Sequence, residues 1–184
     1  MSSAPQTSVD TPAYGEPGYP TDAYATRHNR VETYINEEAS AHLVFGRLVK
    51  LGTADLGGPG VNGAKVPSTK ADKLVGFVTG STSYSRSDQL DGTGVLPKIP
   101  LGVTEKGSLW IMPEEDLVPG DAVHGRVIAN SAKLPGMIGK TDDGVNTIDL
   151  VPFAQVRSAG GPTSGNPIRL TFDFTNAGLA VTDS

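Results

Sequence analysis

Three histidines are the residues of this chain best suited to hold a metal ion, but their spacing argues against such a site. His28, His42 and His124 lie far apart in the sequence, and the chain contains no cysteine. Zinc sites combine histidine and cysteine ligands at short, regular spacings. We therefore expect solvated or hydrogen-bonded histidines, no bound metal and no cofactor.

One short run ends like a phosphate-binding loop. Gly139-Lys140-Thr141 would need a second glycine where this chain has Leu134, and it would also need a strand-to-helix context. The run from Gly161 to Gly165 likewise fails as a nucleophile elbow, because its serine stands one place late. Neither run predicts a phosphate site or a catalytic serine.

Carboxylates cluster at Glu114-Glu115-Asp116 and at Asp142-Asp143. A carboxylate pair can act as acid and base in glycoside hydrolysis when it flanks a sugar cleft. Neither cluster has the spacing of a calcium-binding loop. We interpret both as solvated turn acids and expect that the protein is not an enzyme, with a hydrolase using the first cluster as an alternative.

The single tryptophan and four arginines have structural and interfacial interpretations. Trp110 stands inside an apolar run, which favours packing in the core or between subunits. The arginines either pair with acids on the same sheet or face a partner at an assembly interface; they are Arg86, Arg126, Arg157 and Arg169.

The first 34 residues combine tyrosine, proline and glycine but contain no Leu, Ile, Phe or Trp. Such a segment cannot repay the entropy of ordering by itself. Tyrosine offers a large, stiff contact surface, and proline holds a chain extended before it docks. We predict an extended arm over residues 1–34 that orders on another subunit or partner, with contacts made by Tyr14, Tyr19, Tyr24, Tyr34, Arg27 and Arg30.

The totals exclude several classes of protein. A net charge of −5 gives poor support to a protein that coats nucleic acid, which needs a concentrated positive face. No apolar run approaches the ~20 residues that cross a bilayer, and the chain does not begin like a signal peptide. We expect a soluble protein, made in the cytoplasm, that binds neither nucleic acid nor membrane.

Behind the arm, the pattern is that of short strands with turn chemistry between them. Residues 36–41 could form one helical turn. We predict single strands at 42–51, with a bend at Gly46, and at 73–80, 122–128, 153–157 and 168–174. We also predict two hairpins, one over 99–112 that turns at Glu105–Gly107 and one across Asp142–Gly144. This pattern favours an all-β fold, a small antiparallel β-barrel or sandwich with an extended N-terminal arm and long loops. The predicted body spans 35–184, with loops at 52–72 and 81–97.

The order of several short motifs resembles one known family. The motifs are Gly15-Glu16-Pro17-Gly18, Tyr34-Ile35-Asn36-Glu37-Glu38-Ala39, Phe45-Gly46-Arg47-Leu48-Val49, Gly76-Phe77-Val78, Gly102-Val103-Thr104, Gly107-Ser108-Leu109-Trp110-Ile111, Val118-Pro119-Gly120-Asp121-Ala122-Val123 and Gly165-Asn166-Pro167-Ile168-Arg169-Leu170. Together they resemble the structural cement, or head decoration, proteins of tailed bacteriophages. The resemblance runs from residue 13 to residue 174.

This resemblance implies a β-rich body on the outer capsid surface of a virion, made in the cytoplasm of the host. The implied partners are the major capsid protein and further copies of the chain, as a trimer about three-fold positions or as a dimer. The family has no catalytic residues to carry over. The alternative is a β-sandwich carbohydrate-binding or adhesin-like module that uses Tyr84 or Trp110 as a stacking platform.

Overall fold

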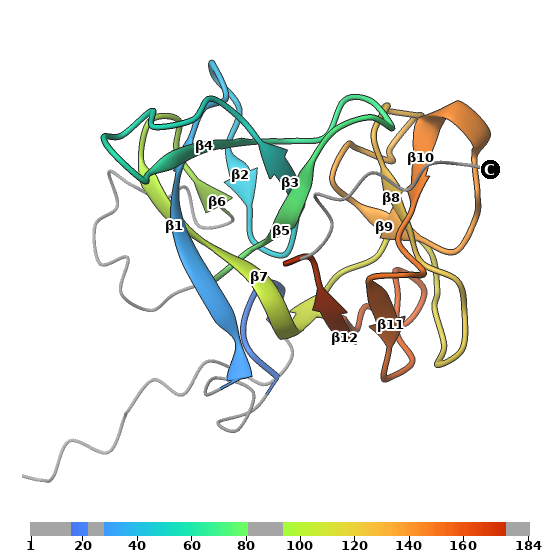
Figure 1. Cartoon of the computed structure of the whole chain (residues 1–184). Helices are drawn as coiled ribbons and strands as arrows, with labels where there is room; N and C mark the ends of the chain where they lie inside the picture. The colour runs from blue at the N-terminus through green and yellow to red at the C-terminus, as the bar shows by residue number, and fades with distance from the viewer. Residues whose placement is uncertain (1–15, 22–27, 81–93, 176–184) are drawn as a thin grey trace, which may run out of the picture.

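The computed structural model describes residues 16–21, 28–80 and 94–175, and these residues form an almost entirely β structure. Its elements are β1 (Arg30–Asn36), β2 (Leu43–Val44), β3 (Leu48–Leu51), β4 (Asn62–Lys65), β5 (Leu74–Val78), β6 (Gly94–Val95), β7 (Pro100–Ile111), β8 (His124–Arg126), β9 (Ile138–Gly139), the 3₁₀ turn η1 (Gly144–Asn146), β10 (Thr147–Asp149), β11 (Ala154–Val156) and β12 (Ile168–Asp173). Figure 1 shows their arrangement. The predicted all-β fold is confirmed.

A small closed barrel forms one half of the described structure. Its strands follow the order β1-β4-β3-β5-β7, and β1 pairs with β7 to close the circle. All of these pairs are antiparallel except β1–β4. Apolar side chains that include Val49, Val78 and Val103 fill the interior.

Strand β7 is long enough to belong to two structures at once. Residues 100–106 pair with β1, and residues 106–111 pair with β12, which in turn pairs with β11. The predicted hairpin at Glu105–Gly107 is therefore wrong, since this stretch lies inside one continuous strand. Hydrogen bonds to β1 and to β12 keep this stretch of β7 extended. Gly107, at a φ of +145°, lies where the pairing of β7 changes from β1 to β12.

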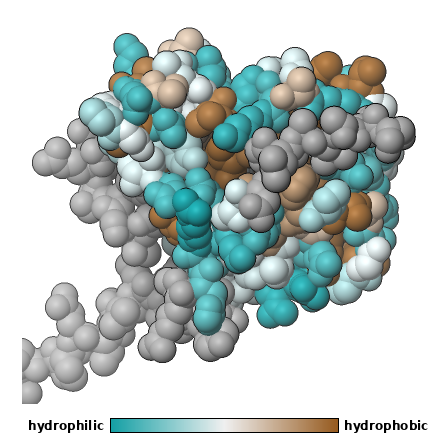
Figure 2. Space-filling model, in the orientation of Figure 1, coloured by the Kyte–Doolittle hydropathy of each residue, from teal (hydrophilic) through white to brown (hydrophobic). Residues whose placement is uncertain are grey.

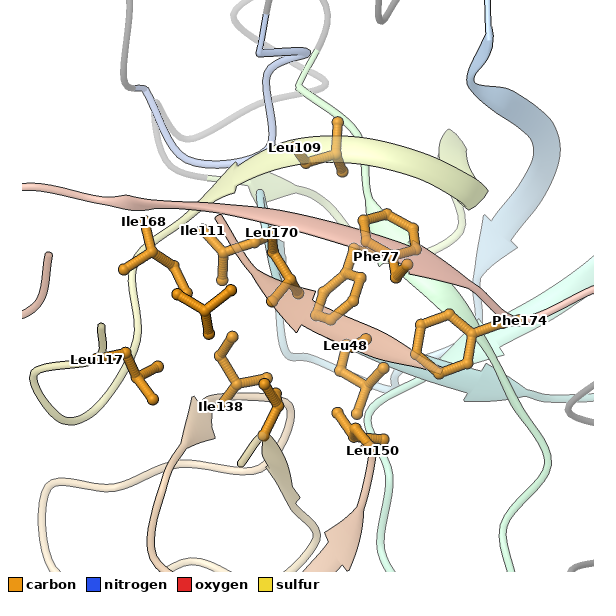
Figure 3. Packing of buried hydrophobic residues seen from close by; sticks show 14 of the residues in the cluster. Leu48, Phe77, Leu109, Ile111, Leu117, Ile138, Leu150, Ile168, Leu170 and Phe174 are labelled. Carbon is orange, nitrogen blue, oxygen red and sulfur yellow. The ribbon is translucent and has the colours of Figure 1, made fainter. Parts of the chain in front are cut away.

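A second lobe consists of the three-stranded sheet β10-β8-β9. The predicted hairpin across Asp142–Gly144 is also wrong, because β8 lies between β9 and β10 and pairs with both. A core of aliphatic and aromatic side chains joins this lobe to the β7–β12–β11 sheet, with Leu48, Phe77, Ile138 and Leu150 among its members. Figure 3 shows these side chains converging from both halves of the structure.

Three further predictions have clear outcomes. Gly46, at a φ of +75°, forms the predicted bend between β2 and β3. Residues 36–41 form no helical turn, since Asn36 ends β1. The predicted loop at 52–72 contains β4, which the sequence did not indicate because its residues are Asn-Gly-Ala-Lys.

No helix in the described part of the chain is long and apolar enough to span a membrane.

Candidate interaction surface

Residues 16–21 lie along β7 as an extra, short strand-like segment. Gly18 N donates to Trp110 O (2.7 Å), and Trp110 N donates to Tyr19 O (2.9 Å). A third bond, from Gly80 N to Gly18 O (2.8 Å), connects the segment to the chain just after β5. Main-chain bonds of this kind do not depend on side-chain identity. We call residues 16–21 the strap.

Close backbone approach explains why glycine occupies position 18. Its φ is +84°, and a Cβ atom would lie 2.8 Å from both Gly46 N and Phe45 Cβ. Glycine tolerates this conformation and leaves the required space. The sequence therefore specifies where the strap crosses the barrel.

Tyr19 packs the strap against the barrel through an aromatic contact. Its ring meets Phe45 edge-on, with 6.4 Å between ring centroids. Gly80 leaves room for this ring, since a Cβ there would lie 2.6 Å from Cε2 of Tyr19. Burial and the nearby Glu16 carboxylate raise the pKa of the Tyr19 hydroxyl.

Asn29 bridges the strap and β1 along the same edge of β7. Ser108 N donates to Asn29 Oδ1 (3.0 Å), and Asn29 Nδ2 donates to Ser108 O (3.4 Å). Thr21 N donates to the same carbonyl (3.4 Å). The side chain of Asn29 thus substitutes for a strand neighbour between the two segments.

A groove of about 540 Å³ lies over the outer face of the β7–β12–β11 sheet. Thr21, His28 and Asn29 line one side of this groove, and Val151 and Phe153 line another. Its remaining lining residues are Lys106, Gly107, Ser108, Pro152, Ala154, Gln155, Arg169, Thr171, Phe172 and Asp173. In Figure 2, hydrophilic and hydrophobic side chains are interspersed over the face in view rather than gathered into one apolar patch.

Cross-strand pairs organise the groove floor. Ser108 Oγ and Thr171 Oγ1 share a hydrogen bond (2.7 Å), and Lys106 Nζ forms an ion pair with Asp173 Oδ2 (2.6 Å). Arg169 stands opposite Trp110, one step along the same face. The alternation of apolar and polar residues along β12 indicates from the sequence that Arg169 lies on the polar face of that strand. The residues opposite Arg169 on the neighbouring strands depend on the pairing register, which no local sequence motif reveals.

The predicted contact residues fall in different environments. Tyr34 is 5% exposed and lies in the barrel core, where its hydroxyl donates to Glu105 Oε1 (2.8 Å). Arg30 is exposed and forms ion pairs with Glu32 (3.2 Å) and Glu105 (3.1 Å).

Of the other predicted contacts, Tyr19 fastens the strap. Tyr14, Tyr24 and Arg27 lie outside the described residues.

The carboxylate clusters serve structural contacts. Glu114 forms a buried ion pair with Arg126, so the expectation of a solvated acid is wrong for this residue. Glu115 accepts from Lys133 Nζ (2.5 Å) and from the backbone of Lys140 and Thr141. Asp143 reaches Arg126 from the rim of the same cluster (3.1 Å).

Metal binding finds no support in the described part of the chain. Within residues 16–21, 28–80 and 94–175, no group of three His, Cys, Asp or Glu residues could hold a metal ion. The described residues instead form a surface with three features: the main-chain strap, the groove lined by polar and apolar side chains, and exposed arginines.

Comparison with known proteins identifies a family by its sequence and a solved structure with a similar fold. A family model described as structural cement protein (E217 gp24/Pam3 gp6) matches residues 6–173. A chain in the solved capsid of Myoviridae phage XM1 has a similar fold, with a TM-score of 0.53 and 13% identity over 79% of this chain and 83% of that chain. No curated protein matches the sequence significantly.

Proposed function

The chain belongs to the phage structural cement protein family, and from this membership we propose that it binds the outer surface of the major capsid protein lattice and stabilises the head. The family match over residues 6–173 carries the proposal, because it includes both the strap and the β-rich body. In this role the protein belongs to the virion and catalyses no reaction.

The strap suggests how such binding is built. Residues 16–21 are already held by main-chain bonds along β7, so the segment before them starts from a fixed point on the barrel. Residues 1–15 span at most roughly 50 Å when extended. We propose that this part of the arm, including Tyr14, lies across a neighbouring subunit and that Tyr24, Arg27 and Arg30 add contacts to the same partner.

Multivalent attachment allows contacts that are individually weak to keep an oligomer bound to the capsid. We propose self-association about three-fold positions, with a two-fold dimer as the alternative arrangement. Once one copy of an oligomer is bound, the others bind at a high effective concentration on a rigid lattice. Each arm then needs only a modest affinity.

Truncation and co-sedimentation test the proposal. The variant lacks residues 1–15 and retains the strap, and its thermal midpoint is compared with that of the full chain. We expect an unchanged fold and much weaker co-sedimentation with heads of the phage that encodes the protein, prepared without it. Full occupancy by the truncated protein would show that the arm is not the attachment.

A second measurement concerns stabilisation itself. Decorated and undecorated heads are heated while DNA release is followed. We expect release at a higher temperature from decorated heads, and equal temperatures would contradict a clamping role. Binding of the isolated protein to an array of sugars, with no binding to heads, would instead favour the carbohydrate-binding alternative.

A further inference from the structure

Two arginines oppose one another on the outer face of the β7–β12–β11 sheet. Arg157 N donates to Arg169 O (2.8 Å), which extends the β11–β12 register by one pair. Ala154, Val156, Ile168 and Leu170 point inward and are buried. The alternation therefore directs both arginine side chains outward, where both residues are exposed.

Neither guanidinium has an ionic partner within the part of the chain that the structure describes. The ion pairs found there involve Arg30, Lys50, Lys65, Lys106, Arg126 and Lys133. Like charges placed directly opposite on a sheet are destabilising. The chain carries 20 acidic residues, yet none of those described forms a salt bridge with this pair.

Trp110 extends the pair into a row across three strands. It lies opposite Arg169 on β7 and is half-buried. Its indole Nε1 is buried without a hydrogen-bond partner among the described residues. The row Trp110–Arg169–Arg157 thus presents two exposed guanidinium groups that have no acidic partner among the described residues, beside a half-buried indole.

The groove next to this row could hold an extended segment of a partner protein. Arg169 also lines the groove, together with the Ser108–Thr171 hydroxyl pair and the apolar side chains of Val151 and Phe153. A guanidinium fork matches a carboxylate in two parallel hydrogen bonds. Positive charge beside a mixed polar and apolar groove fits an acidic peptide segment.

We propose that the Trp110–Arg169–Arg157 row and the groove bind a carboxylate-bearing segment of the major capsid protein. This inference rests on the proposed function and names the chemistry of its partner. A second copy of the chain fits less well, because a two-fold contact through this face would set arginines against arginines. A bound carboxylate offsets the repulsion between the two guanidinium groups and accepts hydrogen bonds from them.

The test measures how strongly charge variants of the full-length protein bind to phage heads that were prepared without the wild-type protein. The variants are Arg157→Glu/Arg169→Glu and the neutral Arg157→Gln/Arg169→Gln. The control is Lys70→Glu/Lys73→Glu, which makes the same change of net charge at exposed lysines near the start of β5. Thermal midpoints confirm that each variant is folded.

We expect the Glu variant to bind at least about tenfold more weakly, the Gln variant to be intermediate, and the lysine control to match the wild type. Raising the salt concentration should narrow these differences, since exposed charges are screened. If the Glu variant does not fold, the Gln variant alone decides the outcome.

The possible failures are distinguishable. Wild-type protein that does not bind heads would overturn the proposed function and this inference with it. Wild-type binding that both arginine variants retain in full would overturn the inference alone. Loss of self-association in the absence of heads, seen by analytical ultracentrifugation of the Gln variant, would assign the row to a second copy and also overturn it.

Discussion

Arg126 and Glu114 form a buried, two-pronged ion pair that fastens the small lobe to the chain leaving β7. Arg126 Nη2 lies 2.7 Å from Glu114 Oε1, and Arg126 Nε lies 2.7 Å from Oε2. The two side chains are 1% and 2% exposed. Asp143 and Lys133 approach this pair from the solvent side (3.1 and 3.7 Å).

Breaking this pair should destabilise the fold strongly. Arg126→Met leaves the Glu114 carboxylate buried without its partner, a change that typically costs about 3–5 kcal/mol. Lys133→Met is the control, because Lys133 is 34% exposed and its ion pairs should contribute at most about 1 kcal/mol. Urea denaturation measures both, and equal losses would contradict the special role of the buried pair.

Acid should weaken the protein between about pH 4.5 and pH 2. Burial raises the pKa of Glu115, but Lys133 and the backbone amides of Thr141 and Lys140 outweigh it and lower the pKa to about 2. Burial likewise raises the pKa of Asp72, while the amides of Ser68 and Thr69 and the Lys50 ammonium lower it to about 2.

The sign follows from these lowered pKa values. A carboxyl whose pKa is lower in the folded state stabilises it above the unfolded-state pKa, and this contribution disappears as the pH falls through the folded-state value. Each group should contribute roughly 2–3 kcal/mol at neutral pH. The free energy of unfolding of Glu115→Gln should be lower than that of the wild type at pH 7 and should change less with pH between pH 5 and pH 2. A pH curve parallel to that of the wild type would contradict this assignment.

Gly18→Ala should loosen the strap. The added Cβ meets Gly46 and Phe45 at 2.8 Å, on backbone at a φ of +84°. Gly60→Ala is a matched control, since Gly60 has a φ of +82° and open space at the Cβ position. The control should show only the conformational cost of about 1 kcal/mol, whereas Gly18→Ala should lose more and expose the strap to limited proteolysis. Equal losses and equal cleavage would show that the close approach is unimportant.

Tyr34→Phe should weaken the barrel without disturbing its packing. The variant removes the hydrogen bond to Glu105 Oε1 (2.8 Å), and bonds to charged groups contribute about 1.5–3 kcal/mol. Burial, followed by the hydrogen bond to Glu105, raises the pKa of the Tyr34 hydroxyl, so this tyrosine should stay protonated in alkaline solution. The Tyr19 hydroxyl forms no hydrogen bond with another described residue, so Tyr19→Phe should change the free energy of unfolding by less than about 0.5 kcal/mol. Thermal or urea denaturation compares the two, and similar losses would contradict the prediction.

The sequence by itself determined the all-β class, the strand at 168–174 and the bend at Gly46. Each of these depends on local chemistry: alternating burial along a strand, or a backbone conformation that glycine adopts readily. The order of the motifs, which is likewise a property of the sequence alone, indicates the cement protein family.

Tertiary structure alone decided how these elements are paired. The stretch around Gly107 has the residues of a turn, but β1 and β12 on either side hold it within one strand. Tyr34 has the residue type of an interface contact, yet the closure of the barrel places it inside. Arg157, Arg169 and Trp110 become neighbours only through register, because hydrogen bonds between strands join residues that are distant in the chain and leave no local pattern in the sequence.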